Sequence, residues 1–194
     1  MSVEPRPAVA PPLRRLRRAE RHDQILAAAT RAFARSGFAA TSLDDIAAEA
    51  GISRVILYRH FESKADLYRA VLDRACSRLA AAVGDEYTAT TMDALLGAAA
   101  DDPDGFRLVF QHAAREPEFK AEIDQLRADS VEVAHHYLAR EIADPAWASW
   151  AAQLAPTVAV DAVIAWLDAG QPDRDRAADR ILRVLGAITA AAQR

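Results

Sequence analysis

Apolar side chains recur with the period of an α-helix along almost the whole chain, and this pattern restricts the fold more than any other feature. In the first such segment, Ile25, Ala29, Ala32 and Phe33 are spaced i, i+4, i+7 and i+8, so they share one helical face. Alanine, the strongest helix former, supplies about a quarter of the residues. We find no convincing alternation of β-branched residues, which a strand would show. The sequence therefore predicts an all-α fold with about nine helices.

The composition argues against several other classes of protein. Intrinsic disorder is disfavoured because 52% of the 194 residues are hydrophobic, which is enough to build a core. The single cysteine, Cys76, has no partner for an intramolecular disulfide and favours a reducing, cytoplasmic location. No apolar run is expected to approach the roughly 18 residues of a membrane span. Pro and Arg interrupt everything before residue 20, which argues against a secretory signal.

Glycine, proline and capping residues divide the helical pattern into segments. Residues 1–17 hold four of the nine prolines and several arginines, and we interpret them as a disordered tail. Helices are expected near residues 18–36, 42–50, 53–60, 64–83 and 91–100, from residue 103 onward, and near 117–142, 146–169 and 174–193. Pro156 lies inside the eighth of these helices and should kink or split it.

Charge is distributed unevenly along the chain. Residues 1–78 carry a net charge of +5 and residues 79–194 a net charge of −9, which the overall value of −4 conceals. A basic front half favours contact with nucleic acid by that half alone. The arginines between residues 14 and 18 have two interpretations: an arm that enters a minor groove or follows phosphates, or the solvated start of a helix.

Three helices with a glycine turn between the second and the third form a helix-turn-helix pattern. Ser42, with Asp45 three residues later, is expected to form a capping box at the start of the second helix. Gly51 is expected to end that helix with a positive φ. Ser53 should cap the third helix, whose inward side chains include Leu57. By itself, this generic pattern is weak evidence for DNA binding.

The residues that fill this pattern resemble the DNA-binding signature of the TetR (tetracycline-repressor) family. The similarity lies in Phe33…Gly37-Phe38, in Thr41-Ser42-Leu43…Ile46-Ala47, and in the stretch GISRVILYRHFESK at 51–64 with Ala-Asp-Leu after it. It covers about residues 20–70, one quarter of the chain. It implies a helix-turn-helix DNA-binding domain over 18–64 and a helical ligand-binding and dimerisation domain over 65–194. The resemblance further implies a homodimeric, ligand-responsive transcriptional regulator of operator DNA, usually a repressor.

In such folds the third helix lies in the major groove, with its N-terminal residues toward the base edges. Arg54 matches the O6 and N7 atoms of a guanine, whereas the apolar Val55 and Ile56 suit thymine methyl groups. Family members often have a small residue and a Thr at these two positions, so the base preference stays open. The residues expected to bind DNA, at base edges or at phosphates, are Thr41, Ser42, Ser53, Arg54, Val55, Ile56, Tyr58, Arg59, His60 and Lys64.

The back half is expected to supply a dimer interface and a ligand pocket. The resemblance implies that the last two long helices of two subunits form a four-helix bundle; alternatively, their apolar stripes pack only within the monomer. The expected interface residues are Val158, Ala162, Val163, Trp166, Ile181, Leu182, Leu185 and Ile188. The middle helices would enclose a pocket for a small lipophilic ligand, although each aromatic residue there, taken alone, is more typical of a core. The expected lining residues are Met92, Phe106, Phe110, His112, His136, Tyr137, Trp147 and Trp150.

The sequence contains no motif that indicates catalysis or cofactor binding. We find no nucleophile elbow, no His-Glu-x-x-His, no phosphate-binding glycine loop and no CxxC. His112, His135 and His136 lack the spacing of metal ligands. We therefore predict a protein that is not an enzyme and needs no cofactor or metal. A DNA-binding regulator without a small-molecule effector remains the alternative to a ligand-released repressor.

Overall fold

The computed structural model describes residues 17–84 and 90–193, and the regular structure in these two stretches is entirely helical. Its nine α-helices are α1 (Arg18–Ala40), α2 (Leu43–Glu49), α3 (Arg54–Tyr58), α4 (Lys64–Val83), α5 (Thr91–Asp101), α6 (Pro103–Arg107), α7 (Lys120–Leu138), α8 (Pro145–Asp168) and α9 (Arg174–Ala192). A π-helical turn (Leu108–His112) and a 3-10 turn (Ala113–Arg115) connect α6 with α7. The predicted all-α fold is confirmed for the described residues. The predicted tail up to residue 16, with Arg14 and Arg15, lies outside them.

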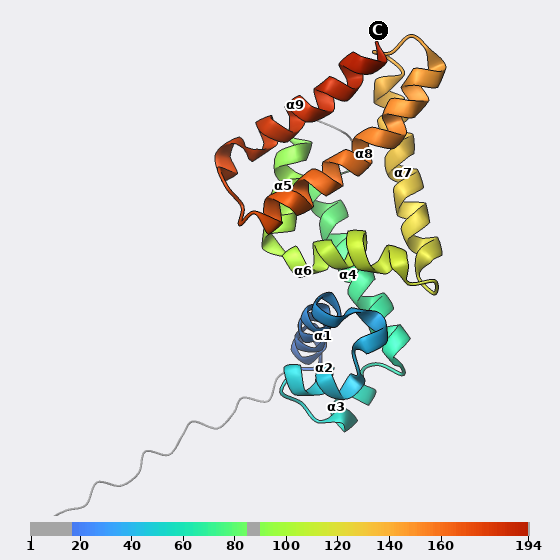
Figure 1. Cartoon of the computed structure of the whole chain (residues 1–194). Coiled ribbons are helices and arrows are strands. Elements are labelled where there is room, and N and C mark those ends of the chain that lie inside the picture. The colour runs from blue at the N-terminus through green and yellow to red at the C-terminus, as the bar shows by residue number, and fades with distance from the viewer. Residues whose placement is uncertain (1–16, 85–89, 194) are drawn as a thin grey trace, which may run out of the picture.

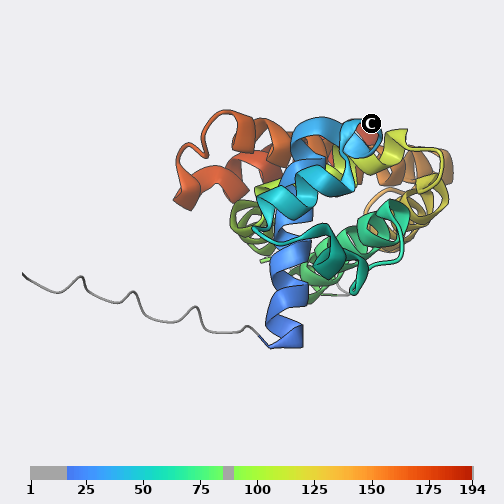
Figure 2. The same ribbon diagram turned by 90° about the horizontal axis from the view of Figure 1, so that it is seen from below.

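Two groups of helices are joined by α4. In Figure 1, α1, α2 and α3 form the lower end of the molecule, and α4 leads from them into the part that contains α5 to α9. Figure 2 shows the molecule from the α1–α3 end. Both α6 and the π-helical turn contact α1, whereas α8 contacts α5, α7 and α9. The short helix α3 therefore lies at one end of the molecule, far from α9 (Figure 1).

A first hydrophobic core holds α1 to α4 together. Phe33 of α1, Ile46 of α2, Leu57 of α3 and Leu67 of α4 are completely buried in it. Helices as short as α2 and α3 are not stable alone in water, so this burial holds them in place. Five further buried members come from the π-helical turn and the segment after it: Leu108, Val109, Ala113, Phe119 and Ile123. The core of the helix-turn-helix unit therefore extends well beyond residue 64.

Tyr68 of α4 lies at the centre of an aromatic cluster in this first core. Its ring centroid is 4.8 Å from that of Phe33, 4.9 Å from that of Phe38 and 4.5 Å from that of Phe119. The side chain is fully buried, and its hydroxyl has no hydrogen-bond partner among the described residues. Burial raises the pKa of this hydroxyl well above its usual value.

A second hydrophobic core joins α5, α6, α8 and α9. Phe106 of α6, Val163 of α8 and Ile181 of α9 are buried in it. Phe110 of the π-helical turn packs against both the first and the second core. The two groups of helices are thus connected by side chains as well as by α4.

Two expected features of the later helices differ in the structure. The long helix α7 spans Lys120–Leu138 rather than 117–142; Phe119 occupies its N-cap in a non-helical conformation, and Ala139 is its C-cap. Helix α8 continues through Pro156, so of the two expected effects of this proline, a kink or a split, the split does not occur. Proline removes one helical hydrogen bond there, and buried alanines on both sides, Ala152 and Ala159, hold the two halves against the rest of the molecule.

The helix α8 also corrects the expectation about membrane spans. An 18-residue window in it has a mean hydropathy of 1.4, so by length and composition alone it is apolar enough to cross a membrane. Of that window, 39% is buried inside the molecule, and its buried side chains belong mostly to the second core. A core helix passes the same test, and α8 is packed between α7 and α9 as such a helix.

Candidate nucleic-acid interface

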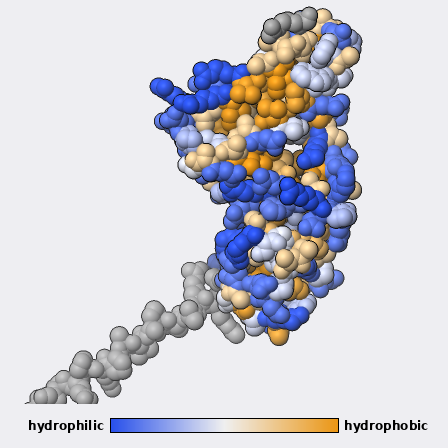
Figure 3. All heavy atoms as spheres, in the orientation of Figure 1, coloured by the Kyte–Doolittle hydropathy of each residue, from blue (hydrophilic) through white to orange (hydrophobic). Residues whose placement is uncertain are grey.

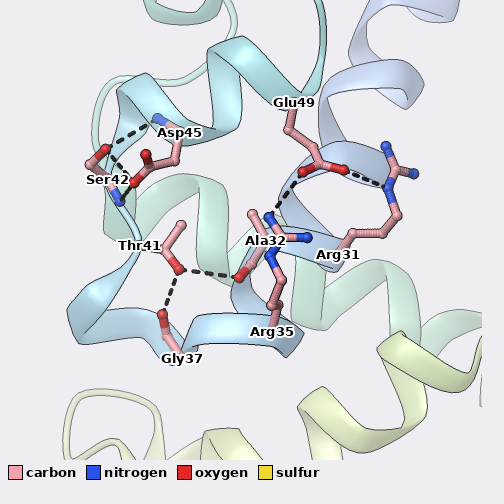
Figure 4. A network of polar contacts seen from close by, with 8 residues as sticks. All are labelled: Arg31, Ala32, Arg35, Gly37, Thr41, Ser42, Asp45 and Glu49. Carbon is pink, nitrogen blue, oxygen red and sulfur yellow. Dashed lines mark hydrogen bonds and ion pairs between the residues drawn. The ribbon is translucent and has the colours of Figure 1, made fainter.

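The corner between α1 and α2 is closed by the hydroxyl of Thr41. Gly37 leaves the helical conformation inside α1 with a φ of +77°. The buried Thr41 hydroxyl faces the carbonyl oxygens of Gly37, at 2.7 Å, and of Ala32, at 3.3 Å (Figure 4). The expectation that this hydroxyl contacts DNA is therefore corrected, because it is buried and satisfies carbonyl groups at the end of α1.

Ser42 begins α2 through the predicted capping box, which is confirmed. Its Oγ accepts a hydrogen bond from the Asp45 N–H at 3.1 Å, and its own N–H donates to Asp45 Oδ2 at 2.9 Å (Figure 4). The Ser42 hydroxyl also donates to Asp45 Oδ2 at 2.6 Å, and these bonds lower the pKa of the Asp45 carboxyl. Ser42 is exposed, and its contact with a phosphate stays a prediction that requires these bonds to be exchanged.

The other end of α2 is held against α1 by polar contacts. Glu49 accepts hydrogen bonds from Arg31 Nε and from an Arg35 Nη atom, each at 2.9 Å (Figure 4). The two guanidinium groups lower the pKa of the Glu49 carboxyl. Gln24 of α1 donates through Nε2 to the carbonyl oxygen of Ala50 at 2.8 Å. The orientation of α2 on α1 is therefore fixed at both ends.

The turn between α2 and α3 depends on Gly51. Its φ is +62°, as predicted, and the Ile52 N–H that follows it donates to the Ala47 carbonyl oxygen at 3.0 Å. Ser53 occupies the N-cap of α3, but its side chain makes no capping hydrogen bond, so that part of the prediction is wrong. The turn is fixed by backbone geometry and leaves the Ser53 side chain exposed.

Helix α3 has one buried side and one exposed side. Leu57 anchors it in the first core, and Ile56 is half-buried. On the exposed side, 63% of Val55 and 44% of Tyr58 are accessible to solvent, and Arg59 is exposed as well. This side therefore presents apolar, aromatic and cationic groups together. Such a mixture matches base methyl groups, base acceptors and phosphates.

The exposed Arg54 side chain is held by two neighbours. Its Nη1 donates to Asp44 Oδ2 of α2 at 3.1 Å, and its Nη2 donates to the Tyr58 hydroxyl at 3.2 Å. The guanidinium carbon also lies 5.4 Å from the centroid of the Tyr58 ring. The Tyr58 hydrogen bond, followed by the Asp44 charge, raises the pKa of Arg54 further above its ordinary value.

Two residues after α3 that are predicted to contact phosphates, Lys64 and His60, make contacts within the protein. Lys64 Nζ donates to the Phe38 carbonyl oxygen at 2.8 Å and lies 4.5 Å from the centroid of the Phe38 ring. Its ammonium group thus caps the end of α1. Because an ammonium group has three donors, a contact of Lys64 with a phosphate stays a prediction. The ring of His60 is half-buried 5.9 Å from that of His22. Burial, followed by the neighbouring His22, lowers the pKa of His60, which disfavours the cationic form that would attract a phosphate.

A hollow of about 300 Å³ lies between α4, α5 and α6. Its lining residues are Ala75, Arg78, Leu79, Ala82, Ala98, Asp101, Asp102, Gly105, Phe106, Val109 and Phe110. Of the residues predicted to surround a ligand, Phe106 and Phe110 line this hollow. The other six lie elsewhere: Met92 is buried in the second core, His112 and Tyr137 are half-buried, and His136, Trp147 and Trp150 are exposed.

The predicted dimer-interface residues divide into two sets. Val163, Trp166 and Ile181 are buried in the second core of the monomer, which corrects their assignment to an interface. Leu182 is 42% exposed, and the others are partly exposed: Val158, Ala162, Leu185 and Ile188. Figure 3 shows apolar surface gathered over α8 and α9.

Several residues that shape this region were missed by the sequence analysis. Asp44, Glu49 and Gln24 act through partners that are 10 to 26 positions away in the chain, so no local pattern indicates them. Within the described residues, no group of three His, Cys, Asp or Glu side chains is placed to hold a metal ion. Cys76 is half-buried, and burial raises the pKa of its thiol.

Known proteins share both the sequence and the fold. The family model described as bacterial regulatory proteins, tetR family, matches residues 25–71. The HTH-type transcriptional activator FasR of Mycolicibacterium smegmatis is 31% identical over 177 residues, which are 85% of this chain and 81% of that protein. A TetR-like regulator from Rhodococcus sp. RHA1 has a similar structure, with a TM-score of 0.74 and 25% identity over 90% of this chain and 96% of that one. FadR of Bacillus subtilis, solved in complex with stearoyl-CoA, matches with a TM-score of 0.62 and 18% identity, over 84% and 97% of the two chains.

Proposed function

The chain belongs to the TetR family and is a DNA-binding transcriptional regulator rather than an enzyme, and from this premise we propose that it is a ligand-released repressor. In this proposal a homodimer in the cytoplasm binds a pseudo-palindromic operator, and a small, largely lipophilic ligand releases it. Residues 18–64 form the DNA-binding domain, and residues 65–194 bind the ligand and the second subunit.

The observation that carries the DNA-binding part is the exposed side of α3. A five-residue helix is anchored by one buried leucine, while Arg54, Val55 and Tyr58 face solvent at the end of the molecule. The supporting observation is the combination on one exposed side of a cationic, an apolar and an aromatic side chain, which suits a base-reading surface. A major groove offers guanine acceptors to Arg54 and thymine methyl groups to Val55.

The dimer is supported by the surface of α8 and α9. Leu182 and the partly exposed Val158, Leu185 and Ile188 leave apolar surface on two adjacent helices (Figure 3). Two copies related by a two-fold axis would cover that surface and place two α3 helices on two half-sites.

The ligand part rests on the position of the hollow. Its volume of about 300 Å³ lies at the lower end of the range for small-molecule sites, and most of its wall is apolar. At its polar side, Arg78 of α4 pairs with Asp102 at 3.5 Å. A ligand there would contact α4, which leads directly to the DNA-binding end, together with Val109 of the first core. Release requires that the ligand binds more tightly to the conformation that does not fit the operator.

Two alternatives share the DNA-binding part. The relative FasR is named an activator, which supports activation as the opposite sign of regulation. The small size of the hollow supports a regulator without a small-molecule effector.

Selection from a library of random-sequence duplex DNA, followed by gel shifts, tests the proposal. Arg54→Ala should weaken binding to the selected site at least about tenfold, with the dimer unchanged by light scattering. The matched control is Arg69→Ala, which removes an exposed arginine from α4 and should have a smaller effect. Wild-type affinity in Arg54→Ala would refute the assignment of α3.

A screen of lipophilic compounds for release of the selected DNA tests the ligand part. Ala98→Phe, which fills the hollow from α5, should abolish release without weakening DNA binding. Unchanged release in this variant would place the ligand elsewhere, and the absence of any releasing compound would favour the effector-free regulator.

A further inference from the structure

We propose that Asp44 is a positioning residue that sets the base specificity of Arg54. This inference rests on the proposed function, in which Arg54 reads a base. Asp44 lies in the first turn of α2, and Arg54 is the first residue of α3. The helix-turn-helix corner brings the two side chains together, with 3.1 Å between Asp44 Oδ2 and Arg54 Nη1.

Arg54 is held on a second side by its own helix. Its Nη2 donates to the Tyr58 hydroxyl at 3.2 Å, one turn further along α3, and the guanidinium lies 5.4 Å from the centre of the Tyr58 ring. A guanidinium group has five N–H donors, so these two bonds leave enough donors for a bidentate contact with O6 and N7 of a guanine. The two contacts fix the plane of the guanidinium before DNA is bound.

The helix dipole favours the Asp44 charge in the first turn of α2, but the Asp44 side chain makes no capping hydrogen bond. Ser42 and Asp45 already form the complete capping box of that helix. Asp44 adds a further exposed carboxylate next to the surface that meets DNA. Phosphates repel this charge, so it lowers the affinity for every DNA sequence equally. In this proposal a stronger preference for one base over the others offsets this loss of affinity.

This preference arises because an arginine that is not held in place can bind phosphates as well as bases. An unrestrained Arg54 also reaches phosphates, and a phosphate contact stabilises the complex without reading the sequence. The Asp44 carboxylate opposes that alternative in two ways, because it holds the guanidinium by a hydrogen bond and repels nearby phosphates. Asp44 therefore favours the base contact over the phosphate contact without touching the DNA itself.

The experiment compares base preference at the position that Arg54 reads. Sites are selected from random-sequence duplex DNA with the wild type, with Asp44→Ala and with Asp44→Asn. The ratio of Kd values for the selected site and for the same site with the contacted guanine replaced is then measured at one salt concentration. In the wild type this ratio should be about tenfold or more. Asp44→Ala should reduce it to a few-fold and should bind unrelated DNA more tightly, while Asp44→Asn, which keeps an acceptor, should lie between them.

Glu62→Ala is the matched control, because it removes an exposed carboxylate from the turn after α3 without removing a contact of Arg54. It should change the affinity for all DNA but leave the ratio at the wild-type value. Thermal unfolding of Asp44→Ala shows whether the fold is retained, and Asp44→Asn serves as the test if it is not.

The outcomes separate this inference from the proposed function. If Arg54→Ala removes the base preference and both Asp44 variants keep the wild-type ratio, the positioning role is wrong and the reading helix stands. An Asp44→Ala ratio higher than that of the wild type would show that the carboxylate holds Arg54 away from DNA, which also overturns the inference. If Arg54→Ala itself keeps the base preference, the reading helix assigned under the proposed function is wrong.

Discussion

Replacing Tyr68 by Phe should stabilise the protein, although it removes a polar group from the centre of the first core. The Tyr68 side chain is fully buried, and its hydroxyl has no partner among the described residues. A buried polar group without a hydrogen bond costs about 1–3 kcal/mol. Phe keeps the ring, and with it the contacts to Phe33, Phe38 and Phe119 at centroid distances of 4.5 to 4.9 Å.

The expected gain at pH 7 is therefore about 1–3 kcal/mol in the free energy of unfolding. For a chain of this length, that corresponds to a rise in Tm of roughly 2–12 °C. Denaturant titration and calorimetry of both proteins measure the two quantities. The control is Tyr58→Phe, which removes the hydroxyl of an exposed tyrosine and should leave the stability nearly unchanged.

The pH dependence provides a second test of the same reasoning. Burial raises the pKa of Tyr68 above its ordinary value of 10.0, so the unfolded chain loses this proton at a lower pH than the folded protein does. The stability of the wild type should fall above pH 10 relative to that of Tyr68→Phe, by about 1.4 kcal/mol per pH unit once the unfolded tyrosine is ionised. A variant that is less stable than the wild type at pH 7 would show that the hydroxyl is hydrogen-bonded, and an equal slope above pH 10 would show that it reaches solvent. Either result would refute the reasoning.

Three further perturbations have defined outcomes. Gly51→Ala should lower the free energy of unfolding by about 1–2 kcal/mol in a urea titration, because a Cβ finds open space there but the φ of +62° is strained for alanine. A gain in stability would refute this. Leu182→Glu should dissociate the proposed dimer in sedimentation experiments and leave the helical content unchanged, whereas Val163→Glu should unfold the chain, because Val163 is fully buried. Cys76 should react with iodoacetamide much more slowly than a free thiol at pH 8, because burial raises the pKa of its thiol. Urea should remove this protection. Equal reaction rates of Cys76 and a free thiol in native buffer would contradict the burial.

The sequence predicted those parts of the fold that depend on neighbouring residues. The bounds of α4, the capping box of Ser42 and Asp45, and the positive φ of Gly51 follow from contacts within a few residues, and all are confirmed. Thr41 and Lys64 were predicted to face DNA because their types and positions fit the family motif. In the structure the buried Thr41 hydroxyl bonds carbonyl groups of α1, and Lys64 Nζ donates to the Phe38 carbonyl oxygen, a residue 26 positions away in the chain.

The assignments in the back half were less accurate for a different physical reason. Helix α8 is apolar on nearly every side, so its periodicity does not distinguish a face that packs inside the monomer from a face left for a partner. Val163 and Trp166 therefore could not be separated from Val158 by sequence alone, although Val163 and Trp166 are buried in the second core and Val158 is partly exposed. Trp147 and Trp150 look like core residues by type, yet half of Trp147 and 41% of Trp150 are exposed.

Part of the first core is made late in the synthesis of the chain. The proposed reading helix α3 ends at residue 58, but Phe119 and Ile123 complete the core that supports it. On a ribosome, the helix-turn-helix segment emerges long before these two side chains do. Although domains often fold in order from the N-terminus as they emerge, this DNA-binding end reaches its final packing only after the first turn of α7 has been made. A nascent chain that stalls before that point contains the whole segment predicted to contact DNA but lacks Phe119 and Ile123, the core residues that support it.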